Sequence, residues 1–192
     1  MRIQHTSRIA VLAGIVALVV SCSKYEDPPK TGLDDRLTNP YCNDPRAINY
    51  NRGFPGKPDN AVCIFPVDSF LGTWLLTDSM FRPNGDTIGV QQKTLSFVAT
   101  EDSVLRHIAM NGWCNNGLAV YLTANKYSFA HVDTLLEGSA GQLNCGSGAD
   151  TLSGNLRLNA DTAIATPGTL MLEFTVSGSE GTVIHRGRAV KQ

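Results

Sequence analysis

The sequence predicts an all-β domain from residue 67 to residue 192. Apolar and β-branched residues alternate with polar ones over short runs there, and apolar residues do not recur at i, i+3, i+4 and i+7 over any long window. Turn sequences rich in Asn, Gly and Ser separate these runs at 83–86, 115–117, 146–148 and 177–179. About eight or nine short strands with tight turns form either an antiparallel barrel or a β-sandwich.

The strands are expected at 71–80, 87–91, 94–99, 104–110, 118–123, 127–132, 154–158, 169–176 and 182–190. A domain of about 126 residues buries roughly two thirds of its surface, which is enough for one hydrophobic core. The domain is therefore expected to fold around a single core.

The first of these strands begins with Phe70-x-Gly72-x-Trp74, which resembles the first-strand Gly-x-Trp of lipocalin-like domains. The resemblance covers three residues at the start of the domain. It implies an up-and-down barrel of about eight strands in which Trp74 plugs the closed end. In that family the last strand carries an Arg near the Trp, and Arg186 or Arg188 is expected in this place.

Residues 1–21 are predicted to be an export signal. Arg2 and Arg8 supply a positive start, and residues 9–20 carry no charge. This apolar run of about a dozen residues is too short to span a bilayer, which needs roughly 20. Without Arg2 and Arg8, 14 of the 16 basic side chains remain against 17 acidic ones, a net charge of −3. Nothing in that charge favours nucleic acid or an anionic membrane surface.

The apolar run ends in Val-Val-Ser-Cys at residues 19–22, which resembles the lipobox of bacterial lipoproteins, with Val19 where Leu is usual. The resemblance implies cleavage before Cys22 and acylation of that residue, with palmitate among the acyl groups, so that the membrane is bound through lipid. An ordinary secretory signal with a chance cysteine is the alternative.

Residues 23–27, Ser-Lys-Tyr-Glu-Asp, resemble the export signal of surface lipoproteins in the Bacteroidota. They imply a location on the outer membrane, exposed at the cell surface; the alternative is simply the solvated start of a tether. Residues 22–39 are polar, contain a Pro-Pro pair and show no periodicity, which predicts a flexible tether.

Residues 40–66 resemble a short cysteine module of exported Bacteroidota proteins, although residues 52–57 are longer and more basic than usual there. The matching residues are Cys42, Asp44, Pro45, Ala47, Asn49, Tyr50, Asp59 and Cys63. With Cys22 acylated, four cysteines remain, and they allow three disulfide connectivities. Completeness of the module favours Cys42 with Cys63, which leaves Cys114 with Cys145.

Oxygen-bearing side chains in this module are weak candidates for calcium ligands, namely Asp44, Asn49 and Asp59. No EF-hand spacing is present, and Asx turns inside a disulfide loop are the favoured interpretation. No metal or other cofactor is expected.

The last sequence pattern is a recurring pair of Asp followed by Ser or Thr. The chain has twelve Asp, and every Asp from Asp68 onward is followed by Ser or Thr. With a small or apolar residue next, this resembles the O-glycosylation motif of exported Bacteroidota proteins and implies acceptors at Ser79, Thr87, Ser103, Thr134, Thr151 and Thr162. The alternative is structural: Asp ends a turn and Ser or Thr begins a strand.

No catalytic motif is found. Gly-x-Ser-x-Gly, His-Glu-x-x-His and phosphate-loop patterns are all missing from the sequence, and His107, His131 and His185 fall on separate predicted strands. A non-catalytic envelope protein is therefore expected, whose barrel binds a small apolar ligand or an envelope component. The alternative is a structural or interaction module that contacts a protein or a glycan through exposed aromatic residues; candidates are Phe81, Trp113, Tyr121 and Tyr127.

Overall fold

The computed structural model describes residues 32, 34–100, 105–134, 141–146, 148, 150–159 and 168–192. The predicted signal at 1–21, Cys22 and most of the tether at 22–39 lie outside the described residues, as do Ser103 and Thr162. Within the described part of the chain, no helix is long and apolar enough to cross a membrane.

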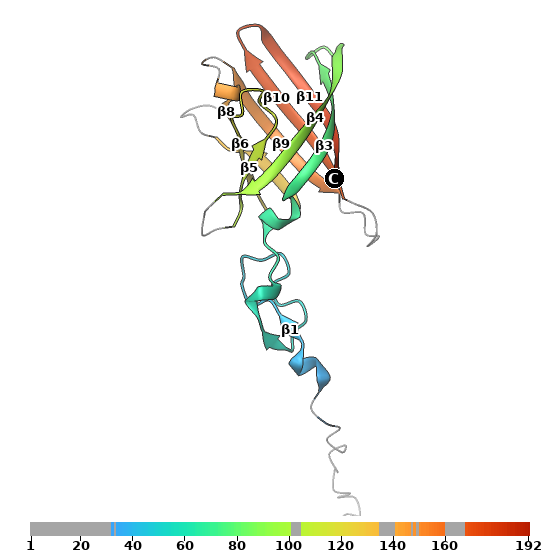
Figure 1. Ribbon diagram of the computed structural model, residues 1–192, viewed down its shortest axis with the longest axis vertical. Helices are drawn as coiled ribbons and strands as arrows, with labels where there is room; N and C mark the ends of the chain where they lie inside the picture. The colour runs from blue at the N-terminus through green and yellow to red at the C-terminus, as the bar shows by residue number, and fades with distance from the viewer. Residues whose placement is uncertain are drawn as a thin grey trace, which may run out of the picture.

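Eight antiparallel strands form a closed barrel (Figure 1). They are β3 (Gly72–Phe81), β4 (Thr87–Ala99), β5 (His107–Asn111), β6 (Val120–Ala124), β7 (Phe129–Val132), β9 (Thr151–Asn159), β10 (Thr169–Gly178) and β11 (Gly181–Lys191). Each barrel strand pairs with the next along the chain, and β11 returns to pair with β3. The prediction of an antiparallel up-and-down barrel is confirmed, and the closed ring of strands excludes the sandwich.

Two details of the strands differ from the expected pattern. The runs at 87–91 and 94–99 are one strand of 13 residues, β4. The polar residues Gln91, Gln92 and Lys93 do not break it, because no Gly or Pro turns the chain there and the in-and-out alternation continues through them. A two-residue strand, β8 (Gln142–Leu143), pairs with the start of β9 and is too short to show in the sequence.

Inward-facing side chains fill the end of the barrel where β3 begins. Trp74, Leu76, Leu95 and Phe97 are at most 2% exposed, and they alternate with outward-facing neighbours as a strand requires. A short 3-10 helix, η3 (Pro66–Ser69), precedes β3. This helix links the cysteine module at 40–66 to the core of the barrel.

The closed end of the barrel is built around Trp74. Its indole Nε1 donates a 2.8 Å hydrogen bond to the carbonyl oxygen of Phe70, which is itself fully buried next to Val67 in the same core. Asp68 fixes η3 by accepting a 2.7 Å hydrogen bond from the Phe65 amide. The expected role of Trp74 as a packing residue agrees with this arrangement.

The cation beside Trp74 is Lys191, which corrects the expectation for Arg186 and Arg188. Lys191 pairs with Trp74 across β11 and β3, and its ammonium lies 5.6 Å from the centre of the indole ring. Arg186 instead forms a 3.3 Å ion pair with Glu173. Residues 186 and 188 have the outward parity of β11, so neither can reach an inward-facing side chain.

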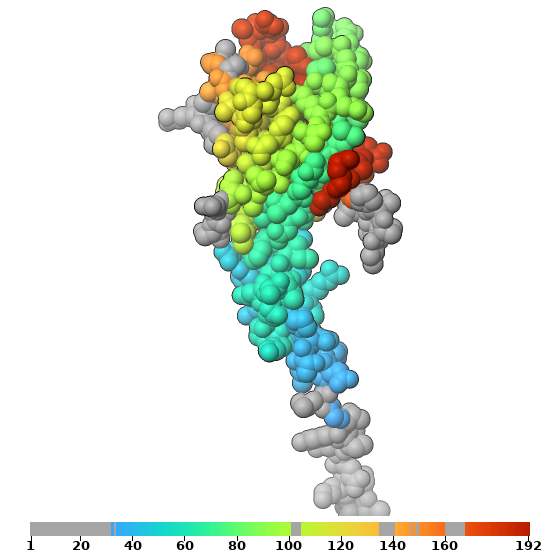
Figure 2. Space-filling model, in the orientation of Figure 1, coloured from blue at the N-terminus to red at the C-terminus, as the bar shows by residue number. Residues whose placement is uncertain are grey.

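The cysteine module lies below the closed end of the barrel and protrudes from it (Figures 1 and 2). It contains η1 (Asp35–Thr38), a parallel pair of two-residue strands β1 (Pro40–Tyr41) and β2 (Lys57–Pro58), and η2 (Asn60–Val62). Its buried apolar residues are Tyr41, Cys42 and Ala47. So small a core depends on the disulfide between Cys42 and Cys63, whose predicted pairing is confirmed.

Candidate functional site

The end of the barrel opposite Trp74 is crossed by the second disulfide. Cys114, in the loop from β5 to β6, is bonded to Cys145 in the short turn η4 (Asn144–Gly146), which confirms the other predicted pairing. The loop directs Trp113 into the barrel, where it is 4% exposed, and its Nε1 donates a 3.2 Å hydrogen bond to Asn144 Oδ1. Trp113 is therefore part of the interior and not the exposed aromatic that the sequence suggested.

A polar cluster lies inside the barrel beneath Trp113. Its members are Asp78 on β3, Gln91 and Lys93 on β4, and His185 on β11, all at inward-facing positions. Asp78 is 0% exposed and His185 is 7% exposed. His185 Nδ1 lies 2.8 Å from Asp78 Oδ2, and Gln91 Nε2 donates a 3.0 Å hydrogen bond to the same oxygen.

Asp78 is held as a carboxylate. Burial raises the pKa of Asp78, but hydrogen bonds from His185 and Gln91, with the positive charge of Lys93, outweigh burial and leave that pKa below its ordinary value. An ionised Asp78 accepts hydrogen bonds only, so His185 must donate from Nδ1. In neutral imidazole the other ring nitrogen, Nε2, is then a hydrogen-bond acceptor.

Lys93 stands beside this pair. Its ammonium donates a 2.8 Å hydrogen bond to the carbonyl oxygen of Trp113 and lies 4.9 Å from the centre of the Trp113 ring. Burial lowers the pKa of Lys93, and the negative charge of Asp78 opposes that effect. An ammonium has three N–H donors, so two remain for other partners.

The open space above these residues is the candidate site, called here the mouth cup. It has a volume of about 430 Å³, within the range of roughly 300–1,000 Å³ typical of small-molecule sites. Apolar walls come from Met80, Trp113, Val176 and Val183, and Lys93 and His185 supply the charged and polar groups. Asn115, Asn116, Asn144 and Cys145 complete the lining. The cup is therefore amphipathic.

The mouth cup offers polar and apolar groups that can bind a ligand. Lys93 offers donors and His185 Nε2 offers an acceptor, while the rings and aliphatic side chains supply apolar contact. The Asp78–His185 pair could activate a nucleophile, but the described residues that line the cup include no Ser, Thr or free Cys, and Cys145 is held in the disulfide. The residues present fit a ligand with adjacent acceptor and donor groups.

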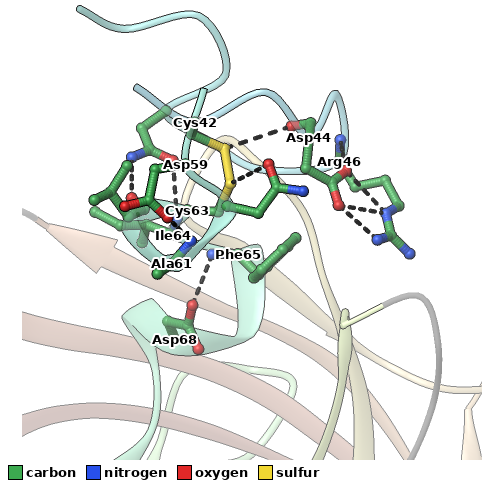
Figure 3. The surroundings of a disulfide bond; sticks show 12 residues. Cys42, Asp44, Arg46, Asp59, Ala61, Cys63, Ile64, Phe65 and Asp68 are labelled. Carbon is green, nitrogen blue, oxygen red and sulfur yellow. Dashed lines mark hydrogen bonds and ion pairs between the residues drawn. A yellow bond between two sulfur atoms is a disulfide. The ribbon is translucent and has the colours of Figure 1, made fainter. Parts of the chain in front are cut away.

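The weak calcium candidates have local partners in the cysteine module (Figure 3). Asp44 forms an ion pair with Arg46, whose guanidinium lowers the pKa of Asp44 to about 2. Asn49 bonds the backbone of Val62 and Ile64, and Asp59 caps η2 by accepting from the Ala61 amide. Among the described residues, no group of three or more His, Cys, Asp or Glu could hold a metal.

The described glycosylation candidates differ in exposure. Thr87 and Thr134 are exposed, whereas Ser79 and Thr151 are partly buried. Several of the preceding Asp residues have structural roles: Asp68 caps η3, Asp78 binds His185, and Asp86 accepts a 2.8 Å hydrogen bond from Asn84 in a turn. Turn and capping chemistry therefore accounts for part of the Asp-Ser/Thr pattern.

The polar cluster was missed by sequence reasoning, although a signal for it exists. Trp74, Leu76, Asp78 and Met80 alternate along one face of β3, so Asp78 belongs to the inward-facing set. The same alternation places Gln91 and Lys93 inside on β4. Charged side chains at inward positions of three strands indicate a polar end of the barrel. Comparison of the chain with models of known protein families and with curated proteins gave no match.

Proposed function

We propose that this protein is a non-catalytic, lipid-anchored protein of the bacterial outer membrane that binds a small molecule in the mouth cup. The lipobox ending at Cys22 and the polar tether after it support the anchor and the location. The observation that carries the binding role is the buried Asp78–His185 pair with Lys93 beside an open cup of about 430 Å³.

The ligand is amphipathic and small. Its apolar part packs against Trp113 and Met80, and its polar part accepts from Lys93 and donates to His185. A hydroxy acid or an amide meets both requirements, while a purely apolar molecule would leave the two remaining N–H donors of Lys93 desolvated without a partner. The barrel below the cup is filled by its own side chains, so an elongated lipid chain does not fit.

Native mass spectrometry of the full chain, purified in mild detergent, tests this proposal. The wild-type protein is expected to carry a co-purifying small molecule, and Lys93→Met is expected to lose it because the variant removes the donor while keeping the length of the side chain. Lys126→Met is the matched control, since Lys126 is exposed in the turn between β6 and β7, outside the cup.

Two outcomes would contradict ligand binding in the mouth cup. Wild-type protein that carries no small molecule, and that also shows no saturation transfer in NMR with a library of hydroxy acids and amides, contradicts binding in the mouth cup. A ligand retained equally by wild type and by Lys93→Met places the binding site elsewhere.

A further inference from the structure

A second hollow lies on the outer wall of the barrel, away from the mouth cup. Five outward-facing residues form one cross-strand row along the register of the sheet: Thr77 on β3, Arg188 on β11, Met171 on β10, Arg157 on β9 and Phe129 on β7. A groove of about 890 Å³ follows this row. An adjoining hollow of about 660 Å³ shares four of the five residues and extends the groove to Tyr127.

The groove has an apolar floor. Met171 is 42% exposed, Phe129 is 38% exposed and Tyr127 is 70% exposed, and Leu75 and Val190 add exposed apolar surface beside the row. Exposed apolar side chains that cluster, in contrast to isolated ones, indicate a binding surface. Met, Arg and aromatic residues are also the types enriched where partners bind.

The groove is positively charged. Arg186 and Glu173 also line the groove and form an ion pair at 3.3 Å, but Arg157 and Arg188 have no carboxylate partner in the described part of the chain. Arg188 donates a 3.2 Å hydrogen bond to Thr169 Oγ1, and the Arg157 guanidinium lies 5.3 Å from the centre of the Phe129 ring. These two residues lie two strands apart, or roughly 10 Å, with Met171 between them.

We propose that this groove binds an anionic glycan, a chain of sugars that bear carboxylates. The two guanidiniums are placed to take two carboxylates along one extended chain, as forked donors. Met171, Phe129 and Tyr127 offer apolar surface to the C–H faces of sugar rings, and side chains such as Thr77 and Asn155 offer hydrogen bonds to hydroxyl groups.

The closed barrel favours a glycan over an acidic peptide. An extended peptide gains much of its affinity by adding a strand to an exposed sheet edge. The strands under the groove are paired on both sides, so their backbone groups are already used. Recognition here depends on side chains alone, which suits a ligand whose polar groups are hydroxyls and carboxylates.

Calorimetric titration of the full chain with an oligosaccharide of galacturonic acid tests the proposal. Binding is expected to weaken with added salt, and to weaken about tenfold in Arg157→Gln or Arg188→Gln, the loss expected for one hydrogen bond to a charged group. Both positions are exposed on the outer wall, so the variants keep the fold, which circular dichroism checks. Arg82→Gln, in the exposed turn after β3, is the matched control and is expected to bind as the wild type does.

Two further probes test whether the ligand must carry carboxylates and whether it must be a glycan. The methyl ester of the same oligosaccharide has lost its charge and is expected not to bind, and polyglutamate is expected to bind more weakly than the uronate. Binding of the ester as tight as that of the acid overturns the role of the arginines. Polyglutamate that binds as tightly as the uronate overturns the glycan assignment, and wild-type affinity in the Arg157→Gln, Arg188→Gln double variant overturns the site.

Discussion

At the scale of single residues, Asp78 carries a high desolvation cost, because its charged carboxylate is fully buried in the barrel. One carboxylate oxygen bonds His185 and Gln91, and the other, Oδ1, is buried with no hydrogen-bond partner among the described residues. Such a group destabilises a protein unless its charge is compensated. The lowered pKa of Asp78 indicates that His185, Gln91 and Lys93 more than compensate for burial.

A glycine makes room for Leu76, which neighbours this cluster on β3. Gly187 lies opposite Asp78 in the register of β11 and β3. A Cβ at residue 187 would approach Leu76 Cδ1 to 2.5 Å, closer than packed atoms allow. Glycine in the middle of a strand is unfavourable in itself, and here the close packing around Leu76 and Asp78 explains it.

Asp78→Asn is expected to lower the free energy of unfolding at neutral pH by roughly 1.5–3 kcal/mol, the typical value of a hydrogen bond to a charged group. Because the pKa of Asp78 is lowered in the folded state, its stabilising effect is complete above the ordinary carboxyl range, about pH 4. The effect is lost as the pH falls through the lower folded pKa. The difference between wild type and variant should therefore shrink in acid.

Urea unfolding followed by tryptophan fluorescence at several pH values measures this difference. Asp86→Asn, in an exposed turn, is the control, because it removes a carboxylate without touching the polar cluster. A gap between wild type and Asp78→Asn that stays constant from neutral pH to pH 3 would contradict the assigned role of the carboxylate.

At the scale of elements, one part of the wall of the mouth cup is formed by segments with little regular structure. The loop from β5 to β6 and the turn η4 are joined by the Cys114–Cys145 disulfide, over a sequence separation of 31 residues. Within these segments, Trp113 packs on Phe174 with ring centres 5.2 Å apart and on His185 at 5.0 Å. The disulfide therefore holds Trp113 over the polar cluster.

Cys114→Ser, Cys145→Ser is expected to cost about 2–4 kcal/mol of unfolding free energy, since a loop of this length gives roughly 3.5 kcal/mol by chain entropy. Trp113 should become more exposed, so the emission of the native protein should move to longer wavelength. Urea unfolding and emission spectra check both effects. An unchanged midpoint with unchanged emission would show that the strands hold the loop without the disulfide.

The elements were predictable to different degrees. Alternation and turn residues were sufficient for the barrel strands, because one face of each strand is buried and the pattern repeats every two residues. The pattern was insufficient at residues 91–93, where the inward-facing polar residues Gln91 and Lys93 looked like a break between strands. Polar residues that line a site weaken the alternation on which strand prediction depends.

Prediction of the site requires the register between strands that are far apart in the chain, and local sequence patterns do not give that register. Asp78 and His185 are 107 residues apart and meet only because β11 closes the barrel against β3 with a particular register. The same register decides that Lys191, and not Arg186 or Arg188, reaches Trp74. A family resemblance indicated the type of residue near Trp74, but register and parity decided which residue it is.

At the scale of the whole molecule, the two ends of the barrel differ in what lies next to them. The closed end of the barrel faces the cysteine module, and the mouth cup lies at the opposite end (Figure 1). If Cys22 is acylated as proposed, the module stands between the membrane and the closed end, and the mouth points away from the bilayer. Such an arrangement leaves both the mouth cup and the outer groove accessible to ligands outside the membrane.

The module is expected to act as a spacer that folds separately from the barrel. Its two strands form a sheet of their own, and no barrel strand pairs with them. Cys42→Ser, Cys63→Ser should therefore unfold the module while the barrel keeps its unfolding midpoint. Both tryptophans of the chain, Trp74 and Trp113, lie in the barrel, so their fluorescence reports the barrel alone.

Limited digestion with trypsin reports the module, because Arg46 and Arg52 lie within it. The variant is expected to be cleaved at these residues quickly, and the wild type slowly. Fast cleavage together with an unchanged barrel midpoint supports a spacer that folds by itself with its disulfide. If the barrel midpoint falls as well, the module stabilises the barrel through η3 and Phe65, and the two parts fold as one unit.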